Sequence, residues 1–208
     1  MIKVEYAHVM GFKGALRGMR NPKNSWSLSD SSFTVEEDKF VIGANDMRLA
    51  KILVLGGTEH RKFLRFAHIQ MDVTAPLFWW KQLDTYKFIQ QNSCSTMHKL
   101  TSRHLNKEDF SCDMIDDEWM NQYLHIMNGK IDIIHNLKER GLDGWKEHER
   151  SLFCMLLESY NQKRTIDLNY ETALNILKQR RSHKLAEWNE FCDELLKLPY
   201  MEVFYGSK

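Results

Sequence analysis

The segment FAHIQMDVTAP, residues 66–76, contains the pattern that decides the fold. From residue 66 to residue 75, small or apolar side chains at the odd positions alternate with the side chains at the even positions, most of which are polar. A period of two places alternate side chains on opposite faces, so this pattern predicts a strand with one buried face. Pro76 lacks a backbone N–H donor and is expected to end the strand.

The residues that precede this segment predict two further strands, a loop and one helix. Residues 2–9 alternate loosely and include β-branched side chains, which predicts a strand. Residues 17–32 are polar and predict a loop, while residues 40–42 predict a short strand. A helix is expected to begin at Asn45 and to stop at Gly56.

The residues that follow it predict helices. Residues 77–86 place aromatic and apolar side chains at helical spacing, which predicts a short buried helix. Three longer helices are expected over residues 116–140, 144–160 and 169–198. The first of them can break at Asn128-Gly129. No repeat, low-complexity tract or linker divides the chain. The sequence therefore predicts one α+β domain over residues 1–208, with strands early and helices late.

Composition excludes several classes of function. The chain has 29 basic and 28 acidic residues, so no overall field favours nucleic acid or an anionic membrane. A nucleic-acid role for the helix that carries Arg180 and Arg181 rests on only a few charges. No segment approaches the ~20 apolar residues of a membrane span. We therefore expect a soluble, cytoplasmic protein.

Cysteines and histidines give no metal motif. The four cysteines are widely spaced without a CxxC pair, which predicts reduced thiols rather than disulfides or a zinc ribbon. His60, His68, His98 and His104 form no HxH or HxxxH pair accompanied by carboxylates. We expect no metal site.

Residues 85–98, TYKFIQQNSCSTMH, follow the predicted strand, proline and helix. In this order they resemble the signature region of flavin-dependent thymidylate synthases, where the same elements precede the motif RHRxxSxNxxSxRY. Gln82 matches a glutamine before the motif, Asn92 and Ser95 match its asparagine and second serine, and Lys87 keeps the charge of its second arginine. A second stretch, residues 173–188, is similar to the C-terminal helix of the family.

That second stretch, ALNILKQRRSHKLAEW, keeps an arginine seven positions before a tryptophan, at Arg181 and Trp188. Elsewhere charged residues of the family pattern are replaced. Thr85 stands for the first arginine of the motif and Tyr86 for its histidine. Met97 and Cys154 stand at two further arginine positions. The candidate replacements are Arg150, which lies four positions before Cys154, and His98, Lys99 and Arg103, which lie close behind Met97.

The resemblance implies an α+β fold whose sheet is antiparallel or mixed and whose C-terminal half is helical, assembled as a homotetramer. It implies FAD as cofactor, NADPH and methylenetetrahydrofolate as co-substrates, and a deoxyuridine nucleotide (dUMP) as substrate. The reaction would transfer a one-carbon unit to the pyrimidine. Such a protein must hold a flavin against a pyrimidine, neutralise phosphates and stabilise negative charge at the uracil edge.

The same resemblance implies roles for individual residues. Arg181 is the expected catalytic residue, because a guanidinium stays charged and its fork can pair with a pyrimidine edge. The expected substrate-binding residues are Gln82, Ser93, Ser95 and Arg150, and the expected cofactor-binding residues are Thr85, Tyr86, Lys87 and Asn92.

Each of these residues also has a plainer interpretation. Arg181 lies among other cations and fits a solvated helix face, while the polar run at residues 92–96 fits a turn or a helix cap. Tyr86 fits core packing equally well. Two functions therefore stay open: an active FAD-dependent thymidylate synthase or close variant, and a degenerate relative that binds a nucleotide, flavin or protein partner without catalysis.

Overall fold

A computed structural model describes residues 1–35 and 39–206 of the chain, which forms two compact units. Unit one comprises residue 1, Thr74–Leu83 and Ser93–Arg164. Unit two comprises Ile2–Val73, Asp84–Asn92 and the chain from Thr165 onward. The expectation of a single domain over residues 1–208 stays a prediction.

A four-stranded sheet runs in the order β1-β4-β6-β5, and the fold is α+β with an antiparallel sheet, as predicted. Its strands are β1 (Lys3–Met10), β4 (His68–Pro76), β6 (Asn161–Asn169) and β5 (Ile89–Ser93). A separate antiparallel pair joins β2 (Ser32–Phe33) to β3 (Phe40–Val41). The strands predicted near residues 2–9 and 40–42 are therefore confirmed.

Strand β4 has the buried face that its alternation predicts. Ile69, Met71, Val73 and Ala75 are fully buried, and the strand ends at Pro76. On the opposite face, Asp167 of β6 accepts hydrogen bonds from β4. Its carboxylate lies 2.8 Å from His68 Nδ1 and 2.8 Å from Gln70 Nε2.

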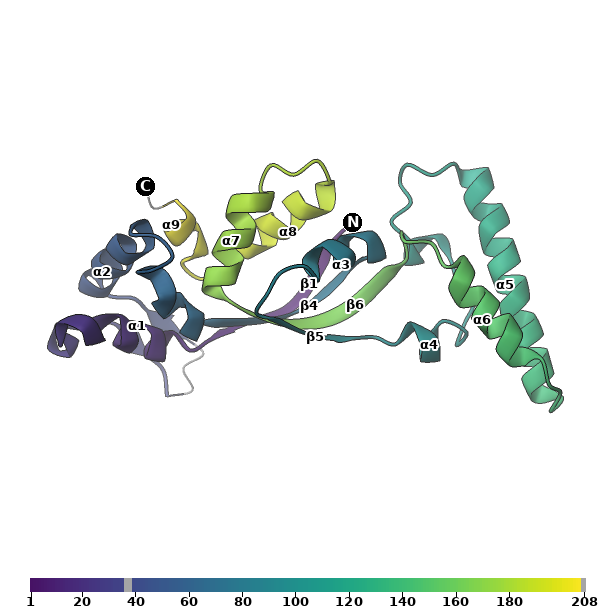
Figure 1. Ribbon diagram of the computed structural model, residues 1–208, viewed down its shortest axis with the longest axis horizontal. Helices are drawn as coiled ribbons and strands as arrows, with labels where there is room; N and C mark the ends of the chain where they lie inside the picture. The colour runs from purple at the N-terminus through teal and green to yellow at the C-terminus, as the bar shows by residue number, and fades with distance from the viewer. Residues whose placement is uncertain (36–38, 207–208) are drawn as a thin grey trace. The chain divides into compact units, whose positions relative to one another are not determined.

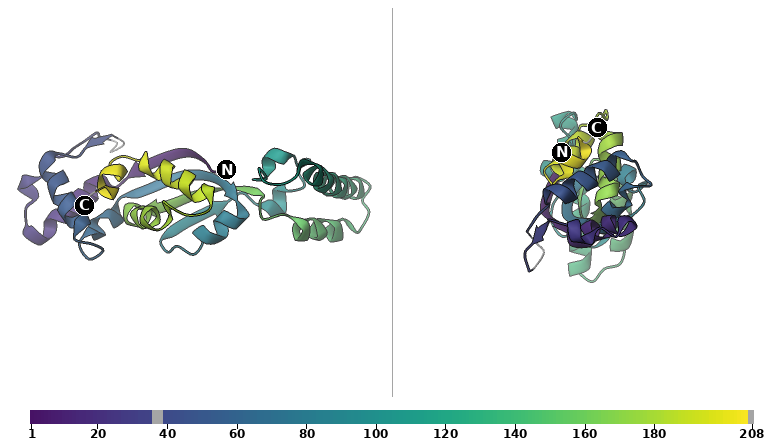
Figure 2. Two further views of the ribbon diagram at one scale, coloured as in Figure 1. Left: turned by 90° about the horizontal axis from the view of Figure 1, so that it is seen from above. Right: turned by 90° about the vertical axis from the view of Figure 1, so that its left-hand side faces the viewer.

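Helices cover the apolar face of the sheet in unit two. Figures 1 and 2 show α7 (Tyr170–Arg180) and α8 (Ala186–Leu196) over that face. Both helices bury large side chains, including Leu174, Leu177, Trp188 and Phe191. A short α9 (Met201–Tyr205) follows them. Helix α2 (Ala44–Leu55) agrees with the helix predicted to begin at Asn45.

The first residues of the predicted loop over residues 17–32 belong to a helix instead. Helix α1 (Phe12–Arg20) includes residues 17–20, and short 3-10 helices follow at Asn21–Lys23 and Trp26–Leu28. Phe12, Leu16, Met19 and Arg20 are buried along one face of α1. The burial of these side chains outweighs the free-energy cost of placing Gly14 and Gly18 in a helix. Because of that cost, the sequence predicts no helix here.

Strand β6 lies between two predicted helices, in residues for which the sequence predicts no element. The sequence places residues 144–160 and 169–198 in helices, but α6 (Trp145–Met155) is shorter and β6 follows it. Two inward positions of β6 are polar, which hides its alternation. Gln162 is buried and donates to Cys94 O at 2.9 Å, while the Arg164 guanidinium lies 4.4 Å from the Trp80 ring centroid.

The predicted C-terminal helix is also divided, because α7 ends at Arg180 and α8 begins at Ala186. Hydrogen bonds of the intervening turn stabilise this break. Leu185 N–H donates to His183 Nδ1 at 3.2 Å, and Asn189 Nδ2 donates to His183 O at 2.9 Å. The turn places Arg181 at the end of α7 instead of within a continuous helix.

Unit one contains the remaining helices. Helices α5 (Asp117–Glu139) and α6 lie side by side in Figure 1, and Met127, Ile131, Ile134 and Leu152 belong to their core. The predicted helix over residues 116–140 is therefore confirmed and is unbroken at Gly129. The short helices α3 (Leu77–Leu83) and α4 (Thr96–Lys99) complete the unit together with a 3-10 turn at Lys107–Asp109.

Helix α3 is buried, as its aromatic spacing predicts. Trp79 and Trp80 have no exposed surface, and the Trp80 indole N–H donates to Gln162 O at 2.9 Å. Across the described residues, no helix combines the length and apolarity that a bilayer crossing requires.

Candidate functional site

An aromatic and arginine cluster in unit two contains one of the predicted cofactor residues. Tyr86 follows α3, Arg180 ends α7 and Trp188 lies in α8. Arg180 Nε donates to Tyr86 Oη at 2.8 Å, and the Arg180 guanidinium carbon lies 4.6 Å from the Trp188 ring centroid. Tyr86 Oη also donates to Gln179 Oε1 at 3.0 Å. The cluster fixes the turn at residue 86 against the end of α7.

Arg181 lies beside this cluster but makes different contacts. Its Nη1 lies 2.6 Å from Asp193 Oδ1 and 3.4 Å from Asn189 O, and 37% of its side chain is exposed. Within residues 1–35 and 39–206, its Nε and Nη2 make no hydrogen bond. The carboxylate of Asp193 therefore holds one nitrogen of the guanidinium while the opposite edge keeps two donors available.

The surroundings of His183 and Cys192 determine the protonation states of these two side chains. Burial lowers the pKa of His183, and the nearby cations Arg180 and Lys184 lower it further. A neutral imidazole suits Nδ1 as the acceptor of the Leu185 N–H. Burial raises the pKa of the Cys192 thiol on α8 to about 11, so that thiol stays protonated at neutral pH.

The other predicted cofactor residues lie on an exposed segment that leads into β5. Thr85, Lys87 and Asn92 are exposed. Lys87 and Asn92 make no side-chain hydrogen bond or ion pair within the described part of the chain. Between them, Phe88 is 76% exposed and has φ of +66°, a conformation that bulky side chains rarely adopt. Such strain is concentrated at functional sites in proteins.

The predicted substrate residues belong to unit one. Ser93, at the end of β5, and Arg150, on α6, are exposed, and Arg150 has no ion-pair partner among the described residues. Gln82 is half-buried at the end of α3. The Ser95 hydroxyl accepts from the His98 N–H at 3.2 Å and caps α4, which is the plainer of its two interpretations.

The positions that lost arginines remain uncharged at the surface of unit one. Met97 is 65% exposed and Cys154 is also exposed. Arg103, a candidate replacement, is bound to Asp109 through two hydrogen bonds. Burial would raise the pKa of Asp109, but hydrogen bonds from Arg103 and from the Asn106 backbone outweigh it and lower that pKa. Both terminal nitrogens of Arg103 are therefore already engaged, by Asp109 and by the His104 carbonyl, whereas Arg150 has no ion-pair partner among the described residues.

Histidines that lie near one another in the sequence have separate partners in the structure. His68 faces Asp167, and His104 Nε2 lies 2.7 Å from Asp132 Oδ1. Among the described residues, no group of three or more His, Cys, Asp or Glu side chains is placed to bind a metal ion. All four cysteines are free thiols, two exposed and two buried.

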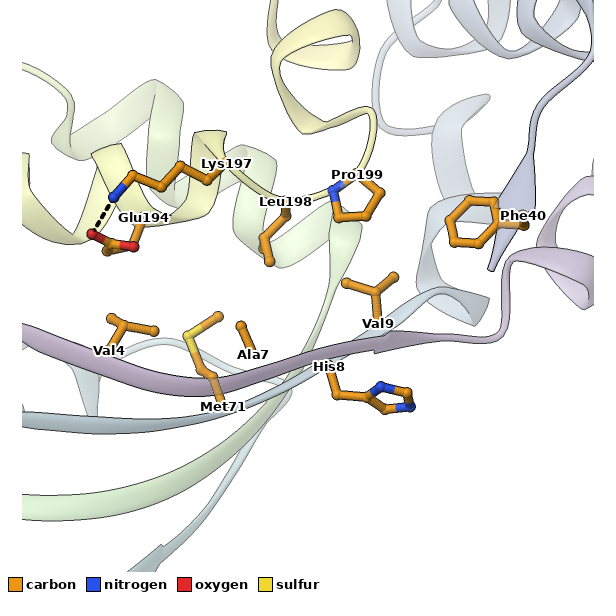
Figure 3. A pocket seen from close by; sticks show the side chains of 10 residues that line it. All are labelled: Val4, Ala7, His8, Val9, Phe40, Met71, Glu194, Lys197, Leu198 and Pro199. Carbon is orange, nitrogen blue, oxygen red and sulfur yellow. Dashed lines mark hydrogen bonds and ion pairs between the residues drawn. The ribbon is translucent and has the colours of Figure 1, made fainter. Parts of the chain in front are cut away.

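A cavity of about 320 Å³ in unit two contains none of the predicted site residues (Figure 3). Its walls are mostly apolar and come from β1, β4 and the turn between α8 and α9. Lys197 Nζ lies 2.6 Å from Glu194 Oε1, and His8 points away from Leu198 and Pro199. Because its lysine and glutamate neutralise each other, this cavity offers little chemistry.

Two residues of the site were missed by sequence reasoning. Arg180 was considered only as a neighbour of Arg181, and Asp193 was not considered at all. The contact of Arg180 with Tyr86 joins residues 94 positions apart, and no local pattern signals it. In a continuous helix, Asp193 would lie about three turns away from Arg181 and could not reach it. The two side chains meet because the chain turns back between α7 and α8.

Comparison with known proteins gives a clear structural likeness. No protein-family model and no curated protein matches the chain. Two solved structures of the flavin-dependent thymidylate synthase ThyX from Helicobacter pylori, each with FAD and dUMP, superpose with a TM-score of 0.71 at 16% identity. The first match covers 97% of both chains, and the second covers 99% of this chain and 97% of the other. The chain thus has the flavin-dependent thymidylate synthase fold, as the signature region predicts.

Proposed function

We propose that this protein is an FAD-dependent thymidylate synthase, or a close variant, that transfers a one-carbon unit from methylenetetrahydrofolate to a deoxyuridine nucleotide. NADPH is the proposed reductant, and a homotetramer is the proposed assembly. The observation that carries this proposal is the available edge of Arg181, held at the end of α7 by Asp193. The likeness to ThyX over nearly the whole chain supports the same scaffold.

Arg181 has the chemistry that the reaction requires of a protein group. A uracil ring that receives a one-carbon unit accumulates negative charge along its N3–O4 edge. A guanidinium N–H can donate to O4, and the two parallel donors match N3 and O4 together once N3 carries no proton. The positive charge favours this charged state over the neutral one. Asp193 occupies only Nη1, so it orients the guanidinium without consuming the donors that would face a pyrimidine.

The segment from Thr85 to Asn92 suits the FAD cofactor. Lys87 supplies an exposed cation that has no partner in the part of the chain that the structure describes, and Asn92 supplies an amide that can both donate and accept. A flavin, when bound, supplies the hydride chemistry of the reaction. The residues of this chain would then bind the FAD phosphates through Lys87 and orient the flavin ring beside Tyr86. Arg181 would stabilise the negative charge of the uracil ring.

The proposed substrate site has fewer positively charged side chains than the family pattern has. Arg150 is the cation for the nucleotide phosphate, and the exposed hydroxyl of Ser93 is an additional donor. Gln82 and Ser95 complete the proposed substrate set. In a homotetramer the substrate residues need not come from the same copy as the cofactor residues, because the resemblance implies active sites shared among subunits.

Absorption spectroscopy and a turnover assay test this proposal together. The purified protein, reconstituted with FAD, is expected to show flavin bands that are released on denaturation. With NADPH, methylenetetrahydrofolate and dUMP it is expected to form a methylated product. A protein that neither retains FAD nor acts on a deoxyuridine nucleotide would contradict the proposal.

A second candidate function is binding of flavin or nucleotide without catalysis. The ion pair of Arg103 with Asp109 favours it, because this pair engages one of the cations that were candidates to replace the lost arginines. Retention of FAD and dUMP without product in the same assay would select this function. Product formation would exclude it.

A further inference from the structure

A second cavity of unit two, of about 330 Å³, has a strongly basic wall. It is bordered by the end of α1, the following turns and one face of α2. Its polar lining comes from Arg20, Lys23, Ser25, Asn45 and Arg48. The opposite wall is apolar and is made by Leu28, Leu49 and Ile52. None of these residues belongs to the site proposed above.

Arg20 is the buried cation among the residues that line this cavity. Its side chain is only 4% exposed, and its Nε lies 2.6 Å from Asp46 Oδ1. Nη1 reaches the Ser25 carbonyl at 3.3 Å, while buried Nη2 has no hydrogen-bond partner among the residues that the structure describes. A buried donor without a partner is costly, so a ligand that accepts from this group would be bound favourably.

Two further cations line the same space. Lys23 is exposed and has no ion-pair partner in residues 1–35 and 39–206, and Arg48 makes only a 3.4 Å contact with Asn45 Oδ1. Asp46 does not line the cavity, and its negative charge is already paired with the positive charge of Arg20. The cavity therefore has an excess of positive charge.

We infer that this cavity binds the phosphate group of a small phosphorylated molecule. Arg20, Lys23 and Arg48 would contact the phosphate oxygens, for which guanidinium and ammonium groups are suited. The apolar wall would receive the organic part of the molecule. The site is separate from the proposed catalytic residues, and the inference does not rest on the proposed function.

Calorimetric titration of the full chain with inorganic phosphate and with phenyl phosphate tests the site, at an ionic strength held constant with chloride. Lys23→Ala and Arg48→Ala are each expected to weaken binding by about tenfold or more, the scale of one charge-assisted contact. Phenyl phosphate is expected to bind more tightly than inorganic phosphate because of the apolar wall. Both substituted residues are exposed, so folding should be retained.

Lys51→Ala is the matched control, since Lys51 is an exposed cation of α2 that does not line the cavity. The affinity of this variant for both phosphate compounds is expected to stay within about twofold of that of the wild type. Equal weakening in all three variants would show diffuse charge screening and would overturn the inference, as would the absence of phosphate binding. A short oligonucleotide that binds more tightly than phenyl phosphate, and loses affinity in the same two variants, would assign the cations to nucleic acid and also overturn it.

Discussion

Two arginine–aspartate pairs of unit two have the same separation but different surroundings. Both Arg20–Asp46 and Arg181–Asp193 have a closest nitrogen–oxygen distance of 2.6 Å. The side chains of the first pair are 4% and 0% exposed, whereas those of the second are 37% and 54% exposed. The two pairs therefore differ in burial and not in the distance between their charged groups.

Burial changes what each pair contributes. Asp46 is surrounded by donors, including the hydroxyls of Ser29 and Ser31, so the charge of Arg20 is compensated inside the protein. Removing one member of such a pair leaves a buried charge without compensation. Solvent screens Arg181 and Asp193, so their attraction contributes little to stability and the guanidinium can reorient toward a ligand.

The largest expected effect is on stability. Asp46→Ala should lower the free energy of unfolding by about 3–5 kcal/mol, because Arg20 would stay buried without its carboxylate. Asp193→Ala, the matched change in the exposed pair, should lower it by only about 0–1 kcal/mol. Chemical denaturation of both variants gives the two values, and similar losses would show that burial does not distinguish the pairs.

The next effect is on catalysis. Arg181→Lys should reduce turnover by roughly tenfold to a hundredfold, because it keeps the charge but removes the two-pronged donor. Ground-state affinity for dUMP should change much less, since the contact strengthens as the uracil edge gains charge.

Lys184→Ala is the control for that variant, because it removes an exposed cation from the same turn. Arg180→Lys is not an inert control, since Arg180 is bound to Tyr86 and packs against Trp188. A wild-type rate in Arg181→Lys would show that the guanidinium fork is not used in the reaction.

A third effect is the response of stability to acid. Burial would raise the pKa of Asp46, but hydrogen bonds from Ser31, Ser29 and Arg20 outweigh it and hold the pKa below the ordinary value of 3.8. The stability from ionised Asp46 is therefore fully present above pH 3.8 and is lost as the pH falls through its folded-state pKa. Denaturation between pH 5 and pH 2.5 should show a steeper decline for wild type than for Asp46→Asn. Parallel curves would assign the acid sensitivity to other carboxylates.

Much of the fold was predictable because it depends on repeated apolar positions. The alternation in residues 66–75 and the aromatic spacing of α3 record burial directly in the sequence. Strand β6 was not predictable in this way, because Gln162 and Arg164 take inward positions and obtain their partners from distant segments. Helix α1 was missed because its apolar stripe is interrupted by glycines.

The candidate site was predictable as a set of residues but not as a set of contacts. Matching spacing alone selected Arg181, and sequence proximity to the lost arginines pointed to Arg150 for the substrate site and to Arg103 as one further cation. The structure separates these two, because a bidentate pair with Asp109 holds Arg103 while Arg150 stays unpaired among the described residues. Such a difference depends on side chains brought together by tertiary packing.

The smallest expected effect is on FAD retention. It distinguishes Lys87, which can bind a ligand, from Arg103, which already binds Asp109. Lys87 is exposed and unpaired within the described residues, whereas Arg103 is bound to Asp109. Lys87→Ala should therefore weaken FAD binding by roughly threefold to tenfold, the effect of one solvent-screened phosphate contact. Arg103→Ala should leave FAD affinity unchanged and should instead lower thermal stability. Flavin absorbance relative to protein absorbance, measured across an FAD titration, gives both affinities. Equal affinities in the two variants would show that Lys87 does not contact the cofactor phosphates.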